Sequence, residues 1–183
     1  STLRNDNPTI KSYPKLTFTI SIKGDVEMDY KIVEMKEFKV LGPSITTTDV
    51  DGENNREIPA FWQRINSDGT AERMYKLAAK SGICYGICYG YDGKSTFKYA
   101  AAVPYEDGDK GEFEVINIPA SKWAIFKSVG PMPKAIQDVW VRIFSEWLPA
   151  TEYEISELPQ LEAYFPGDTS SDDYVSEVWI PVK

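Results

Sequence analysis

Hydrophobic and polar residues alternate along much of this chain, in the pattern of strands with one buried face. Leu16 to Ile22 alternates apolar and hydroxyl residues without a break, so we expect a strand there. The Asp92-Gly93 pair, which separates two such runs, is a strong signal for a hairpin turn. The further strands that we expect are residues 30–33, 38–46, 83–91, 96–104, 113–118, 123–129, 161–165 and 174–182.

Other segments repeat their apolar residues at helical spacing. Between residues 135 and 148 the apolar side chains recur every three or four positions, after Pro131 and Pro133 and before Pro149, which predicts an amphipathic helix. Residues 56–65 and 71–79 predict two further helices, which a polar turn at 66–69 separates.

Two short motifs occur twice, in the same order. The Phe-Lys-Val-Leu-Gly-Pro segment at 38–43 returns as Phe-Lys-Ser-Val-Gly-Pro at 126–131, each time at the end of a predicted strand. Trp62-Gln63-Arg64-Ile65 then returns as Trp140-Val141-Arg142-Ile143, each time on a predicted helix. An ordered pair of echoes in matching elements favours an internal duplication.

The expected fold class is therefore α+β. We expect duplicated strand-helix-strand-strand units with pseudo-twofold symmetry, whose antiparallel sheets surround a central ligand cleft. Residues 1–27 form a linker and leading strand in this interpretation, and residues 28–183 form one domain. Its first repeat is about 28–105 and its second about 110–183.

The amino-acid composition excludes several classes of protein, of functional site and of partner. The chain has 183 residues, of which 42% are hydrophobic and 13% aromatic, which excludes a disordered or fibrous protein. It contains no histidine, so histidine-based triads and histidine-ligated zinc sites are excluded. The net charge of -8 argues against nucleic acid or an anionic membrane as a direct partner of this chain.

Compartment signals point to the cytoplasm. No run of about 18 apolar residues predicts a membrane span, and the first residues lack the pattern of a signal peptide. Cys84 and Cys88 lie four positions apart on one predicted strand, roughly 13 Å along it, which is too far for a disulfide. We expect both to be reduced core residues. The initial Ser suggests an excised piece of a longer protein.

Glu177 is the most unusual charged residue of the sequence. Alternation along the last strand places it on the same face as Val175 and Trp179, and the opposite face is apolar too. A buried carboxylate needs a partner. One interpretation is a structural salt bridge, for example with Arg64 or Arg142; the other is an aromatic pocket in which the carboxylate meets a cationic ligand.

Aromatic side chains supply the other half of such a pocket. Tyr85 and Tyr89 share one face of the strand at 83–91, with Ile87 between them, and aromatic faces attract organic cations. Taken singly, other rings such as Phe61, Trp62, Trp140 and Tyr164 more often belong to a core than to a site.

The acidic loops do not match a calcium site. The loop that starts at Asp49 lacks the glycine at the sixth position and the glutamate at the twelfth, and the loop at Glu106 to Gly111 has no carboxylate at the fifth. The sequence also contains no phosphate loop, dinucleotide fingerprint or nucleophile elbow. We therefore expect no metal, no cofactor and no catalytic residue.

Several motifs together resemble a known family. They are the Phe-Lys-x-x-Gly-Pro strand ends, Ile58-Pro59-Ala60-Phe61-Trp62, the Trp140 segment that continues to Trp147-Leu148-Pro149, and the closing residues 177–182. About residues 28–183 are similar to the GyrI-like effector-binding domain of AraC-type transcription regulators and multidrug-responsive activators. The resemblance implies a duplicated fold with a central pocket and assigns Glu177 to cationic ligands.

The expected function is a small-molecule effector-binding domain of a bacterial transcription regulator, for an organic ligand that is cationic or amphipathic. A GyrI-like small-molecule hydrolase and a stand-alone protein-binding module of the gyrase-inhibitor type are the alternatives. DNA would be bound only through a helix-turn-helix region absent from this chain. The expected ligand-binding residues are Glu177, Trp179, Tyr85, Tyr89, Phe61, Trp62, Trp140 and Tyr164.

Overall fold

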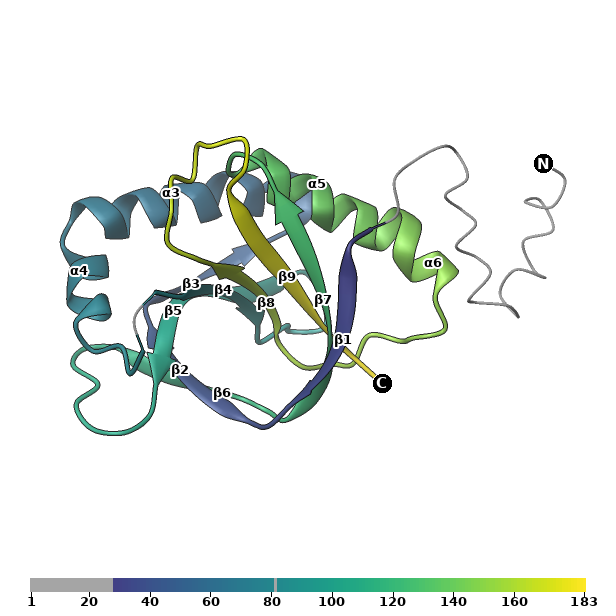
Figure 1. The fold of residues 1–183 in the computed structure, drawn as a ribbon. Helices are drawn as coiled ribbons and strands as arrows, with labels where there is room; N and C mark the ends of the chain where they lie inside the picture. Colours follow the sequence, from purple (N-terminus) through teal and green to yellow (C-terminus); the bar gives the residue numbers. More distant parts are fainter. Residues whose placement is uncertain (1–27, 81) are drawn as a thin grey trace, which may run out of the picture.

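The computed structural model describes residues 28–80 and 82–183. The strand expected at 16–22 lies outside the described residues. Within them, nine strands form one curved antiparallel sheet, and the helices lie on one side of it (Figure 1). This arrangement confirms the α+β class.

The strands of the sheet follow the alternating segments closely. They are β1 (Tyr30–Met35), β2 (Phe38–Gly42), β3 (Ser44–Thr48), β4 (Cys84–Tyr89), β5 (Thr96–Tyr105), β6 (Glu114–Ile118), β7 (Ser121–Val129), β8 (Gln160–Tyr164) and β9 (Val175–Val182). The segment expected as one strand at 38–46 is divided at Pro43, which has no N–H to donate. β2 and β3 nevertheless pair with the same strand, β5.

The hairpin expected at Asp92-Gly93 joins β4 to β5. Gly93 has a positive φ of 80°, and the Asp92 carboxylate accepts hydrogen bonds from the backbone N–H groups of Lys94, Ser95 and Thr96. The turn residues therefore take the roles that their types predict.

The helices differ from expectation mainly at their ends. α3 (Asn54–Ser67) starts earlier than expected and includes Pro59, and α4 (Thr70–Tyr75) ends earlier. The segment expected as one helix at 135–148 consists of α5 (Lys134–Arg142), a π-helical turn (Ile143–Trp147) and α6 (Leu148–Ala150). α3 carries Trp62 and α5 carries Trp140, as the repeated motif predicts.

The strand order is β1-β7-β9-β8-β4-β5-β2-β6, with β3 beside β5. β4 and β8 are adjacent at the centre, and the strands of the two halves follow outward from them in corresponding order. The first strand of each half is exchanged, because β1 pairs with β7 and β6 pairs with β2. A duplication would produce this order, and the superposition of Gly42 on Gly130 and of Trp62 on Trp140 stays a prediction.

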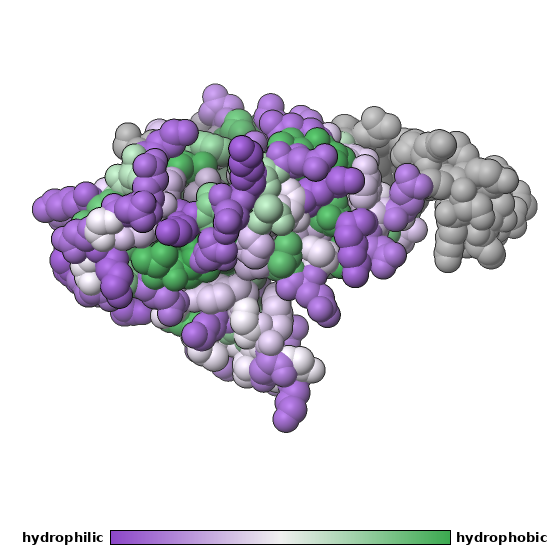
Figure 2. Space-filling model, turned by 90° about the horizontal axis from the view of Figure 1, so that it is seen from below, coloured by the Kyte–Doolittle hydropathy of each residue, from purple (hydrophilic) through white to green (hydrophobic). Residues whose placement is uncertain are grey.

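The two faces of the sheet have different surroundings. One face curls around a hydrophobic core that includes Tyr85, Trp123 and Trp179. The other face lies under α3 and α5 (Figure 1). Seen from the side away from these helices, the surface mixes many hydrophilic side chains with scattered hydrophobic ones (Figure 2). No helix within residues 28–80 and 82–183 is long and apolar enough to cross a membrane.

Candidate functional site

A large cavity lies between the helices and the sheet. Its volume is about 1300 Å³, more than the roughly 300 to 1,000 Å³ that is usual for a small-molecule pocket. α3, α5, the central strands and the loop after β8 all contribute to its wall. The aromatic residues of the wall are Trp62, Tyr75, Tyr91, Phe97, Tyr99, Trp140, Phe144, Tyr164, Phe165 and Tyr174.

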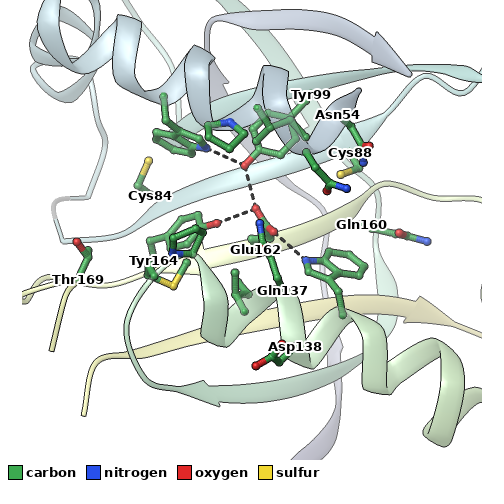
Figure 3. A pocket seen from close by; sticks show the side chains of 18 of the residues that line it. Asn54, Cys84, Cys88, Tyr99, Gln137, Asp138, Gln160, Glu162, Tyr164 and Thr169 are labelled. Atoms are coloured by element: carbon green, nitrogen blue, oxygen red, sulfur yellow. Dashed lines mark hydrogen bonds between the residues drawn. The ribbon is translucent and has the colours of Figure 1, made fainter. Parts of the chain in front are cut away.

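The carboxylate of Glu162 on β8 points into this cavity (Figure 3). Its Oε1 accepts hydrogen bonds from the hydroxyl groups of Tyr99 (2.8 Å) and Tyr164 (2.7 Å). Its Oε2 accepts one from the indole N–H of Trp140 (2.8 Å). The indole N–H of Trp62 donates to the hydroxyl of Tyr99 (2.9 Å), so both helices are linked to this network.

The two phenols remain neutral donors. Burial, and after it the negative charge of Glu162, raise the pKa of Tyr99 and that of Tyr164 well above the ordinary value of 10.0. Neutral donors orient the carboxylate without cancelling its charge.

Among the described residues of the cavity wall, no basic side chain balances this carboxylate. The described residues that line the cavity include Asp49, Asp138 and Glu162 but no Lys or Arg. The cavity is therefore anionic as well as aromatic, and an entering cation would meet opposite charge. Across the described part of the chain, no group of three or more Cys, Asp or Glu side chains could hold a metal ion.

The two cysteines also line the cavity. On β4 they lie two residues before and two residues after the residue that pairs with Glu162 in the sheet. Burial raises the pKa of Cys84 to about 11 and raises that of Cys88 further. Both thiols are therefore protonated near neutral pH. They add small, uncharged surface to the wall and do not form a disulfide.

The residues expected at the site fall into two groups. Trp62, Trp140 and Tyr164 line the cavity and belong to the network around Glu162. Phe61 is buried beside them, with its ring edge-on to that of Tyr99 at 6.1 Å between centroids. It supports the wall from behind.

Glu177, Trp179, Tyr85 and Tyr89 lie on the other face of the sheet. Glu162 pairs with Val178, so Glu177 points away from the cavity, because successive side chains of a strand alternate in direction. Glu177 accepts a hydrogen bond from the indole N–H of Trp179 (2.9 Å), and Tyr85 packs against that indole at 5.9 Å. Of these two carboxylates, Glu162 lines the cavity and Glu177 does not.

Sequence reasoning missed Glu162 and Tyr99. A signal for Glu162 was present, since it lies two residues before Tyr164 on an expected strand and must therefore share its face. For the last strand, which is largely apolar on both sides, the sequence could not indicate which face looks into the cavity.

Comparison with known proteins identifies the family to which this fold belongs. A family described as Cass2, integron-associated effector binding protein, matches residues 31–182. The chain belongs to this family. The resemblance to GyrI-like effector-binding domains is thereby confirmed for the domain type.

Relatives of this Cass2-family chain include a protein named as a candidate regulator and a protein solved with a ligand. YobU from Bacillus subtilis (strain 168), named as a candidate transcriptional regulator, is 27% identical over 119 residues, which are 62% of this chain and 72% of YobU. The structure of SAV2435 bound to tetraphenylphosphonium has a TM-score of 0.74 at 25% identity, over 85% of this chain and 94% of that one.

A third relative shares the fold. The integron cassette protein from the mobile metagenome of Vibrio cholerae has a TM-score of 0.64 at 18% identity, over 84% of this chain and 95% of that one. At 18% identity this likeness shows only that the two chains share a fold.

Proposed function

We propose that this domain binds an aromatic organic cation in the cavity below α3 and α5, and that it serves as the effector-sensing part of a transcription regulator. One observation carries the proposal: the carboxylate of Glu162 is held in an aromatic cavity by neutral donors, and the described wall contains no Lys or Arg. DNA binding would belong to a separate helix-turn-helix region of the parent regulator.

Elementary electrostatics favours a cation at this place. A negative charge in a partly desolvated site is stabilised by an opposite charge within about 4–6 Å. Indole and phenol rings attract cations to their faces, with about 0.5 to 2 kcal/mol per contact. Glu162 is surrounded by four indole and phenol rings. We propose these as the ligand contacts: Trp62, Tyr99, Trp140 and Tyr164.

The relatives support the same class of ligand. SAV2435, with a TM-score of 0.74, is described in complex with tetraphenylphosphonium, which is a bulky cation without hydrogen-bond donors. YobU is named among regulators. The proposal transfers the ligand class and the sensing role, and assigns the negative charge to Glu162.

The test compares two probes of one shape and opposite charge. Calorimetric titration of the protein with tetraphenylphosphonium should give saturable binding, whereas tetraphenylborate, its anionic counterpart, should bind at least about tenfold more weakly because the cavity repels it. Equal affinity for both probes would reduce the site to an apolar cavity and overturn the proposal, as would the absence of binding by the cation.

A further inference from the structure

One position directly beside Glu162 carries no side chain. Gly86 on β4 pairs with Glu162 on β8, at the centre of the sheet. Side chains of directly paired residues point to the same face, about 4.5 to 5.5 Å apart at Cβ. Any side chain at position 86 would therefore point into the cavity beside the carboxylate.

The backbone does not demand a glycine at this position. Among the described glycines, Gly42 and Gly86 alone lack a positive φ, so their backbone conformations are open to other residues. Glycine weakens the interior of a strand because it packs nothing against its neighbours. A glycine here needs another reason, and close approach of neighbouring atoms is the usual one.

The space beside Gly86 is occupied by the hydrogen bond that orients Glu162. A Cβ at this position would overlap the hydroxyl oxygen of Tyr99, and would lie 2.7 Å from Oε1 of Glu162 and 2.9 Å from Cζ of Tyr99. Gly42 differs, because a Cβ there would meet the backbone of Ala101 and Ala102. The neighbours of Gly86 are thus the carboxylate that carries the charge of the site and a phenol that donates to it.

We propose that Gly86 is a positioning residue for the carboxylate. Its bare backbone lets the hydroxyl of Tyr99 reach Glu162, and through that hydroxyl lets the indole of Trp62 join the network. A methyl group at position 86 separates the phenol of Tyr99 from the carboxylate, so Oε1 keeps only the hydrogen bond from Tyr164. The carboxylate group of Glu162 then shifts from its position in the cavity. The effect on cation affinity rests on the function proposed above; the arrangement of the side chains does not.

The first measurement is the affinity for tetraphenylphosphonium in a double-mutant cycle. Gly86→Ala should weaken binding by at least about tenfold, in line with the loss of one hydrogen bond to a charged group. In a Tyr99→Phe background the same substitution should cost less than about threefold, because the hydroxyl oxygen, which makes the closest of the three contacts, is already gone and the other two need smaller shifts. Ile87→Val, in the core on the opposite face of β4, is the control and should change affinity by less than about threefold.

The second measurement needs no ligand. The indole N–H signals of Trp62 and Trp140, assigned by Phe substitution in a nitrogen-15 NMR spectrum, should shift in Gly86→Ala, since both donate into this network. The indole N–H signals of the other tryptophans should not shift, because these side chains have no hydrogen bond to the network: Trp123, Trp147 and Trp179. A merely structural weakening of β4 would not select these two indoles.

The outcomes separate the two proposals. Shifted indole signals without binding of tetraphenylphosphonium to the wild type would overturn the proposed function and support the role of Gly86. Unchanged signals with affinity within about twofold, or equal losses in both backgrounds, would overturn the role of Gly86. If Gly86→Ala does not fold, recovery of folding in Gly86→Ala/Tyr99→Phe supports the role, and failure of both contradicts it.

Discussion

Replacement of Glu162 by Gln is the sharpest test of the site. The substitution keeps the size of the side chain and removes the negative charge. It also places an amide NH₂ in a network of donors, where the indole N–H of Trp140 now bonds to Oε2. The variant should therefore bind cations weakly and be less stable than the wild type.

The magnitudes follow from the geometry. A cationic centre about 5 Å from the carboxylate gains about 3 kcal/mol at an effective dielectric constant of about 20. Part of this gain is lost to desolvation, so Glu162→Gln should weaken the binding of tetraphenylphosphonium by about 1 to 3 kcal/mol, or about 5-fold to 150-fold. The donor that loses its acceptor should lower the free energy of unfolding by about 1 to 3 kcal/mol.

Glu177→Gln is the matched control. Glu177 is also a half-buried carboxylate that accepts an indole hydrogen bond, but it lies on the opposite face of the sheet. Calorimetric titration should show its affinity for the cation within about twofold of the wild type. Equal affinity of wild type and Glu162→Gln, or an equal loss in both variants, would refute the assignment of the charge to Glu162. Urea unfolding of the same proteins measures the stability change separately.

Two further predictions concern the cavity wall and the effect of alkaline pH. Trp140→Phe removes the indole N–H that donates to Glu162, and it replaces an indole by a phenyl ring, which attracts cations less strongly. Tetraphenylphosphonium should therefore bind about threefold to tenfold more weakly in titration. Trp123→Phe, in the core on the opposite face of the sheet, is the control, which should lower stability and leave that affinity unchanged. Burial raises the pKa of Cys84 from 9.0 to about 11 and that of Cys88 further, so the folded state keeps protons that the unfolded chain releases. Each thiol should lower stability by about 1.4 kcal/mol per pH unit between about pH 9 and about pH 11. The phenols that donate to Glu162 should extend this loss above about pH 10. Urea unfolding at about pH 8 and about pH 10.5 should show the difference, and equal stability at both would contradict the burial of these groups.

Periodicity predicted most strands of this fold because each has at least one continuous apolar face. The division at Pro43 has a local cause, because proline has no N–H to donate, whereas the π-helical turn at 143–147 is not evident from the spacing of apolar residues. Motif order predicted that Trp62 and Trp140 would lie on matching helices, and both donate into the network of Glu162.

The face of each strand was the part that the sequence could not decide. β4 carries tyrosines on one side and cysteines and Gly86 on the other, and both sides are largely buried. The large aromatic side chains suggested a ligand wall, yet they fill the core, because a closed core also needs bulky rings. The side of β4 that faces the cavity carries the small side chains, and the aromatic wall of the cavity comes from other elements.

The exchange of first strands between the halves has a consequence for folding. β1 completes the sheet beside β7, and β6 completes it beside β2, so each half supplies an edge to the other. The contacts between them join residues far apart in the sequence, which makes closure of the sheet slow in comparison with local hairpins. A fragment of either half would keep an unpaired strand edge and tend to associate with other chains. The two halves therefore gain their stability together, in one cooperative transition.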